Sequence, residues 1–220
     1  MDEIVDFQHK NHRNLGSNLK EKLLYENIRI AILNLVSSIV PFDELEKEHV
    51  QFVLSWLKSG VQIFRTEKPA KPNPHLVAYF VVVDVELRKI LLVDHNRGEM
   101  WFPTGGHVEP AEHPQNTVKR EACEELGIEA DFLFDHPLLV TITESVWYTE
   151  KHTDVSLWYL LRADSNYQLK YNKKELNRIH WFDWEQIPFQ RSDPHLMRFM
   201  EKTSSLLSLH FGPSSGCSVH

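Results

Sequence analysis

Two nearly uninterrupted apolar segments in the middle of the chain constrain its fold more than any other feature. Residues 76–84 read LVAYFVVVD, and residues 89–95 read KILLVDH. A run in which apolar side chains occupy odd and even positions alike is typical of a strand buried on both faces of a sheet. The short gap between the two segments favours a β-hairpin. The sequence therefore predicts a central sheet with other elements packed on both of its faces.

Further strands and helices are expected on the C-terminal side of this hairpin. A helix is expected from Pro114, which suits a first turn, to Gly127, which suits a helix end. Three later segments are rich in β-branched and aromatic residues and indicate strands, namely 132–148, 154–164 and 179–188. A closing helix is expected over 193–209. Strands before and after a central helix predict an α/β or α+β layered domain.

The first 71 residues predict a helical extension that precedes this domain. Apolar side chains recur at three- and four-residue steps from Leu24 to Ile39, which predicts a helix over residues 18–40. A second helix is expected between Asp43 and Gly60. A proline-rich connector follows, so we expect a domain over 72–205 and a disordered tail over 206–220. The helices either pack on the domain or serve as a substrate-specificity or homodimer contact.

Charge and residue usage disfavour several classes of partner. The formal net charge of −7 argues against DNA or an anionic membrane as the main partner. The start of the chain lacks a signal-peptide pattern, and its most apolar stretch, residues 28–40, is shorter than the roughly 20 residues that a membrane span requires. We therefore expect a cytoplasmic protein. The two cysteines, Cys123 and Cys217, form no zinc pattern, and the thirteen histidines show no HExxH pair, so none is assigned to zinc.

The segment most informative about chemistry is residues 105–128, GGHVEPAEHPQNTVKREACEELGI. In a helix, Glu121 lies on one face with Glu124 and Glu125, at steps of three and four residues. A solvated face is the usual explanation for a pair of glutamates. Three adjacent carboxylates repel one another, however, and a divalent cation such as Mg²⁺ would offset this repulsion with oxygen ligands of the kind it prefers.

The spacing of this segment is more specific than a cluster of acidic residues. It fits G-x5-E-x7-R-E-U-x-E-E-x-G-U, where U is apolar. The fixed positions are filled by Gly106, Glu112, Arg120, Glu121, Ala122, Glu124, Glu125, Gly127 and Ile128. With each fixed residue type at about 6% of residues, a chain of this length matches by chance roughly once in 10⁷. The segment resembles the signature of the Nudix hydrolase family, and the resemblance covers about residues 72–205.

This resemblance implies an α/β/α sandwich with a mixed sheet and a reaction that uses Mg²⁺ or Mn²⁺. Family members cleave a nucleoside diphosphate linked to another group, so the implied partner is a small-molecule nucleotide. The implied metal ligands are Glu121, Glu124, Glu125 and the carbonyl oxygen of Gly105. Glu121 or Glu124 would help to activate water, Arg120 would orient a glutamate, and Glu112 and Gly127 would stabilise the segment itself.

The resemblance also implies a later carboxylate, on a loop before a strand that carries a tryptophan, to complete the site. Glu175 precedes Trp181 by six residues and is the first candidate for an additional ligand or base, with Glu144 and Glu150 in reserve. Gly106, Arg97 and Trp101 are candidates for substrate contacts, although core packing is the simpler role for Trp101.

Two other functions stay open at this point. A catalytically silent nucleotide-sensing module would share the fold, although such modules usually lose signature carboxylates. Hydrolysis of the 5′ end of RNA is weakened by the acidic net charge. Within the hydrolase reading, damaged nucleoside triphosphates, nucleotide sugars, ADP-ribose and dinucleotides are all candidate substrates.

Overall fold

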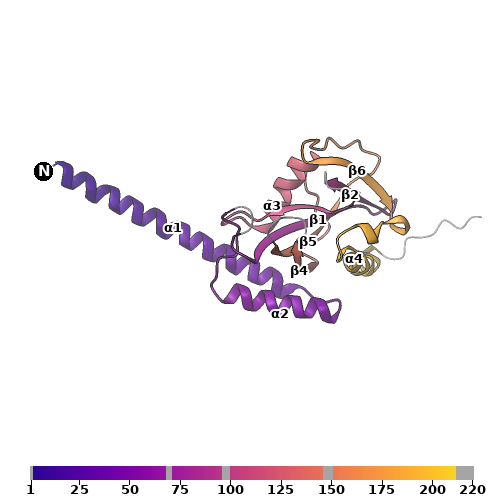
Figure 1. Cartoon of the computed structure of the whole chain (residues 1–220), viewed down its shortest axis with the longest axis horizontal. Helices are drawn as coiled ribbons and strands as arrows, with labels where there is room; N and C mark the ends of the chain where they lie inside the picture. Colours follow the sequence, from indigo (N-terminus) through magenta and orange to yellow (C-terminus); the bar gives the residue numbers. More distant parts are fainter. Residues whose placement is uncertain (1, 68–70, 96–99, 146–150, 212–220) are drawn as a thin grey trace, which may run out of the picture.

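The computed structural model describes residues 2–67, 71–95, 100–145 and 151–211 of the chain. Within these residues, a six-stranded mixed sheet has the order β4-β5-β1-β2-β6, and β3 pairs with β1 (Figure 1). The strands are β1 (His75–Asp84), β2 (Lys89–His95), β3 (Thr104–His107), β4 (Leu139–Ser145), β5 (His152–Arg162) and β6 (Leu176–Asp183). β1 runs parallel to β5 and antiparallel to β2 and β3. The predicted hairpin and mixed sheet are confirmed.

The helices differ from the sequence expectation mainly at their ends. They are α1 (Asp2–Ser38), α2 (Glu44–Lys58), α3 (Pro114–Glu121) and α4 (Leu196–Phe211). α1 begins at Asp2 rather than near residue 18, and Figure 1 shows its first half projecting away from the rest of the molecule. α4 continues to Phe211. Residues 206–211 are therefore helical, and the prediction that they are disordered is wrong. None of the helices in the described ranges is long and apolar enough to span a membrane.

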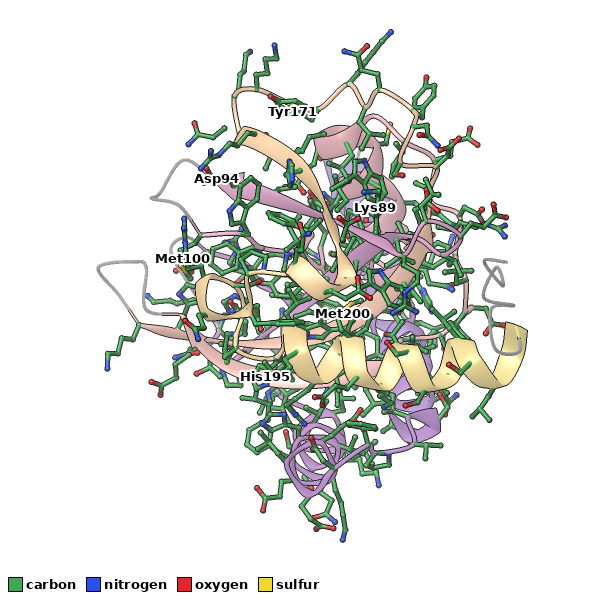
Figure 2. The ribbon with its side chains drawn as sticks, turned by 90° about the vertical axis from the view of Figure 1, so that its right-hand side faces the viewer. Lys89, Asp94, Met100, Tyr171, His195 and Met200 are labelled. Atoms are coloured by element: carbon green, nitrogen blue, oxygen red, sulfur yellow. The ribbon has the colours of Figure 1, made fainter. Side chains whose placement is uncertain are left out.

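β1 is the central strand, and it contributes to a core on each side of the sheet. Leu76 and Phe80 belong to the core that α3 covers, whereas Val81 and Val83 belong to the core that α4 covers. Figure 2 shows α4 along its length, with His195 just before its start and Met200, which joins that second core, within it. Burial of β1 on both faces is what its continuous apolar sequence predicted.

The N-terminal helices share the first of these cores rather than forming a separate one. Ile32 of α1 and Val53 and Leu57 of α2 are at most 1% exposed and belong to the same apolar cluster as Leu76 and Phe80. Burial of such side chains contributes about 1.5–3 kcal/mol each. This packing supports the first of the two roles expected for the extension.

Buried charges fix α2 against α4. Glu46 is fully buried, and its Oε1 accepts a hydrogen bond of 2.7 Å from Nζ of Lys202. One residue before α2, Asp43 caps the helix by accepting a hydrogen bond from the amide of Glu46, and it also binds Arg198 through two hydrogen bonds. The bond from Arg198 is the main reason that the pKa of Asp43 falls to about 2. The predicted start of the second helix is therefore correct.

Candidate active site

The signature segment forms an α-helix that changes to a wider helix before it ends. α3 passes at Ala122 into a π-helical turn, Ala122–Leu126, and Gly127 stops the turn with φ +64°. The amide of Ile128 donates back to the carbonyl of Ala122, which closes the end. The sequence predicted one continuous α-helix. Single π-helical turns inside α-helices occur often at functional sites, because they alter which side chains share a face.

The apolar stripe of this segment holds it on the sheet. Val118, Ala122 and Leu126 are fully buried in the core that includes the even-numbered residues of β1. This docking was expected from their spacing. It leaves the glutamates of the segment at the edge of the packed surface, next to β3.

Three of the glutamates differ strongly in their surroundings. The side chain of Glu125 is buried, that of Glu121 is 14% exposed, and that of Glu124 is 57% exposed. Burial, followed by repulsion from Glu121 and Glu175, raises the pKa of Glu125 to about 8. Burial also raises the pKa of Glu121, against the effect of Arg120. The site therefore concentrates carboxyl groups where water screens charge poorly, which penalises their ionised forms.

Glu175 comes to this cluster from a distant part of the sequence. The amide of Asn172 donates a 2.8 Å hydrogen bond to the carbonyl of Glu125, and Nδ2 of Asn172 donates one of 3.1 Å to Glu175. The charge of Glu175 raises the pKa of both Glu121 and Glu125. We call Glu121, Glu124, Glu125 and Glu175 the carboxylate cluster.

Arg120 is the positive group that organises one side of the carboxylate cluster. Its Nη1 donates a 2.6 Å hydrogen bond to Oε1 of Glu121, and Nε and Nη2 donate to the two oxygens of Glu112. Nη2 also donates to the carbonyl of His107 at 3.3 Å. One guanidinium thus joins α3 to the loop before it and to the end of β3.

Glu112 closes the loop that precedes α3. It accepts hydrogen bonds from the hydroxyl of Thr117 and the amide of Glu109, in addition to those from Arg120. Burial raises the pKa of Glu112, but these bonds outweigh burial and leave the pKa below its usual value. Its contacts are those of a residue that supports the loop.

Gly106 is required by the close approach of β3 to Glu121. A Cβ atom at this position would lie 1.9 Å from Oε1 of Glu121, well inside contact distance. At Gly105, a Cβ would lie 2.4 Å from the carbonyl oxygen of Ala78 on β1. The glycine pair therefore lets one strand pass between β1 and the glutamate.

Other residues predicted for the site lie elsewhere. Trp101 is only 9% exposed and packs in the core under α4, with Phe182 at its edge and Arg178 over its face. These contacts favour packing over base stacking. Glu144 lies near the end of β4, opposite Thr153 of β5, and is exposed. Arg97 and Glu150 lie outside the described residues.

The carboxylate cluster has the chemistry of a site for a hard divalent cation. Oε2 of Glu125 is buried and has no hydrogen-bond partner among the described residues. An unpaired buried carboxylate oxygen is costly, and the three neighbouring carboxylates add to that cost. A cation such as Mg²⁺ prefers oxygen ligands of this kind. The residues therefore fit the metal that the signature implies.

Comparisons with known proteins give the same assignment. The model of the NUDIX domain matches residues 74–202. An uncharacterized Nudix hydrolase of Bacillus subtilis, YvcI, is 30% identical over 124 residues, which cover 54% of this chain and 75% of that protein.

Two solved structures are also similar. A NUDIX-family hydrolase from Clostridium perfringens has a TM-score of 0.47 at 19% identity, covering 61% of this chain and 99% of its own. A MutT NUDIX hydrolase from Burkholderia pseudomallei has a TM-score of 0.41 at 23% identity. The matched region covers 51% of this chain and 85% of that chain. The match of the domain model over more than half of the sequence, together with the B. subtilis relative, shows that this chain belongs to the Nudix hydrolase family.

Proposed function

We propose that this hydrolase cleaves the pyrophosphate linkage of a nucleotide, or of a nucleoside diphosphate conjugate, in a reaction that depends on Mg²⁺ or Mn²⁺. The observation that carries the proposal is the carboxylate cluster, in which Glu125 keeps a buried oxygen without a hydrogen-bond partner. Glu121, Glu124 and Glu125, with the carbonyl of Gly105, are the proposed ligands. When bound, the cation neutralises phosphate charge and lowers the pKa of a water molecule.

The side chains of the site would hold the proposed ligands in place and accept a proton from the attacking water. Glu121 is held by Arg120 at 2.6 Å, so one of its oxygens is fixed while the other is left for a ligand. Glu175 is exposed and lies within electrostatic reach of Glu121 and Glu125, which suits a group that accepts a proton from the attacking water. Gly106 would let a phosphate approach the strand, because it presents no side chain.

The test is turnover of a nucleotide panel with Mg²⁺ and with Mn²⁺, followed through released phosphate. The panel holds canonical and oxidised nucleoside triphosphates, ADP-ribose, nucleotide sugars, NADH and diadenosine polyphosphates. We expect at least one good substrate whose turnover falls by about 10³-fold or more in Glu124→Gln, a loss of roughly 4 kcal/mol of transition-state stabilisation. Glu86→Gln, in the β1–β2 turn, is the control and should be fully active. Unchanged turnover in Glu124→Gln would disprove the assigned site, and nucleotide binding without any turnover would favour the sensing module.

We also propose that the protein is cytoplasmic and forms a homodimer through its N-terminal helices. Support comes from α1, which leaves Leu19, Leu23, Leu24 and Ile30 between 52% and 70% exposed. Such apolar surface is typical of a contact with another chain. Light scattering should give twice the monomer mass, and Leu23→Glu with Leu24→Glu should give the monomer. Cell fractionation tests the location.

A further inference from the structure

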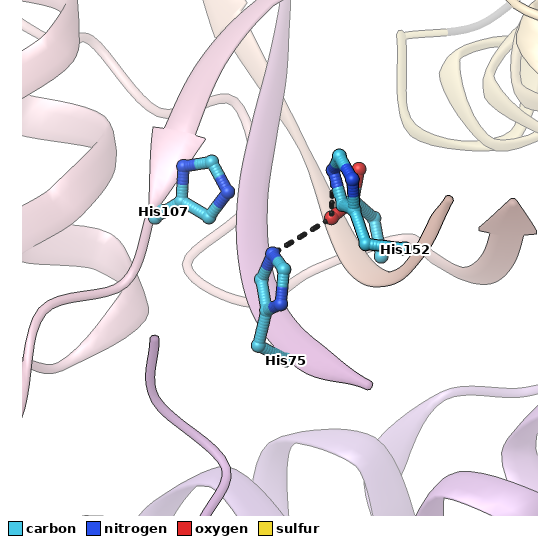
Figure 3. A group of neighbouring side chains, drawn as sticks. His75, His107 and His152 are labelled. Carbon is cyan, nitrogen blue, oxygen red and sulfur yellow. Dashed lines mark ion pairs between the residues drawn. The ribbon is translucent and has the colours of Figure 1, made fainter. Parts of the chain in front are cut away.

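Three histidines and one aspartate meet at one end of the sheet. His75 begins β1, His152 begins β5, Asp154 lies directly opposite His75 in the parallel β1–β5 register, and His107 ends β3. One nitrogen or oxygen from each of these side chains lies within 4.8 Å of all the others. Figure 3 shows the labelled rings of His75, His107 and His152 near one another, and its dashed lines mark the contacts that His75 and His152 make with Oδ1 of Asp154. We call these four residues the histidine–aspartate cluster.

The hydrogen bonds of His75 leave an unsatisfied contact at the centre of this cluster. Nδ1 of His75 lies 2.9 Å from the carbonyl oxygen of Pro72, which only accepts hydrogen bonds, so Nδ1 carries the proton. In its neutral form, the ring then presents a lone pair of Nε2 to Oδ1 of Asp154 at 3.0 Å, and only a protonated ring would make an ion pair there. Both atoms are buried and have no hydrogen-bond partner among the described residues, and the same holds for Nε2 of His107. A cation between these atoms would convert the repulsion into coordination.

The donor set favours a transition metal over Mg²⁺. Three imidazole nitrogens and one carboxylate oxygen are ligands that Zn²⁺ binds in a tetrahedral site. A hydrogen bond from the remaining ring nitrogen to a backbone carbonyl, as His75 makes to Pro72, is the usual support of a metal-bound histidine. Zn–N bonds of about 2.0 Å place tetrahedral ligand atoms about 3.4 Å apart. The widest pair of ligand atoms, at no more than 4.8 Å, would therefore have to close by at most about 1.4 Å.

Two of the three rings are almost fully shielded from water. His75 and His152 are at most 4% exposed. Burial, followed by the charge of Arg65, lowers the pKa of His107 to about 3. Arg65 is the cation that faces the cluster from the connector after α2.

From this geometry we infer that the histidine–aspartate cluster is a structural site for a tetrahedral divalent transition metal ion, with Zn²⁺ as the ion it takes first. It differs from the carboxylate cluster in its donor atoms, and four protein ligands would leave no open position for a substrate. Its ion would join the starts of β1 and β5 to the end of β3. β3 also carries Gly105 and Gly106, and the carbonyl of His107 accepts a hydrogen bond from Arg120. The ion would therefore stabilise the strand against which Glu121 is placed.

The expectation that no histidine binds zinc is revised by this proposal. His75, His107 and His152 are far apart in the sequence and follow no short spacing. Only the pairing of three strands brings them together. A local signal existed only for His75 and His152, which each begin an apolar strand segment, whereas His107 follows a glycine pair.

The first test measures zinc in the full-length protein after loading with one equivalent of Zn²⁺ and exhaustive dialysis. We expect about one zinc per chain in the wild type, and less than a tenth of that in the double variant His152→Ala/Asp154→Asn. His136→Gln, at a partly exposed histidine outside the cluster, and Glu124→Gln, in the carboxylate cluster, should both retain the zinc. Loss of the ion from Glu124→Gln but not from the double variant would overturn the proposal, because the carboxylates would then be the ligands.

A second test uses only the wild-type protein, in case the double variant does not fold. Co²⁺ added in place of Zn²⁺ should give the intense visible absorption of a tetrahedral site, and X-ray absorption of the zinc form should show four N/O ligands with imidazole scattering. Zinc should also raise the melting temperature of Glu124→Gln as much as that of the wild type. Weak octahedral Co²⁺ absorption, or no metal retained after dialysis, would mean that these residues form only an ion-pair network. Either outcome would leave the proposed hydrolysis at the carboxylate cluster untouched.

Discussion

Glu125→Gln should make the metal-free protein more stable while it abolishes turnover. The native pKa of this carboxyl is about 8, against an ordinary value of 4.5, because burial and the neighbouring carboxylates penalise its charge. An acid with a raised native pKa binds more protons in the native state than in the unfolded state. Its contribution to stability is therefore full below about pH 4.5 and is lost as pH rises to about 8.

The expected change in the free energy of unfolding follows from these two pKa values of Glu125. The span from 4.5 to about 8 corresponds to at most roughly 5 kcal/mol, at about 1.4 kcal/mol per pH unit. Local relaxation and water entry reduce this to about 2–4 kcal/mol. Glutamine has nearly the same shape and keeps an acceptor oxygen for the amide of Gly105, which lowers the pKa of Glu125 through a hydrogen bond. The variant should thus gain about 2–4 kcal/mol at pH 8 and almost nothing at pH 5.

The assay is urea denaturation in EDTA at pH 5, 6, 7 and 8, with the midpoint and slope fitted for both proteins. The wild type should lose stability steadily over this range, and Glu125→Gln should lose much less. Added Mg²⁺ should stabilise the wild type at pH 8 and have a smaller effect on the variant, because a ligand that binds only the native state shifts the equilibrium. Parallel pH profiles for the two proteins would refute the reasoning, since the charge of Glu125 would then carry no cost.

Three further substitutions test other contacts. Gly106→Ala should reduce turnover by about 10²-fold or more with little loss of fold, because its Cβ would displace Glu121; wild-type kinetics would show that the strand adjusts freely. Lys202→Met should cost about 3–5 kcal/mol in urea denaturation by leaving Glu46 buried without its cation, and adding Glu46→Gln should recover much of this; equal losses in the single and double variants would contradict that account. Gly127→Ala should cost about 1–2 kcal/mol in the same assay because φ is +64°, whereas a neutral effect would mean that the turn relaxes.

The sequence was most informative where local pattern and burial agree. The continuous apolar run of β1, the stripe of Val118, Ala122 and Leu126, and the capped start of α2 all followed from spacing. The π-helical turn did not, because residues 122–126 have no composition that separates it from an α-helix. Glu175 was predicted by resemblance alone, and its approach to Glu125 depends on the hydrogen bond from Asn172 across the fold.

The helices that precede the family-matched span limit where this chain can be truncated. Ile32, Val53 and Leu57 fill the same core as Leu76 and Phe80, although only the latter two lie within residues 74–202. A fragment limited to that span would expose the apolar face of the sheet that these helices cover, and it should aggregate or fail to express. The smallest autonomous folding unit therefore starts before α2, and any relative without such helices must cover this face by other means.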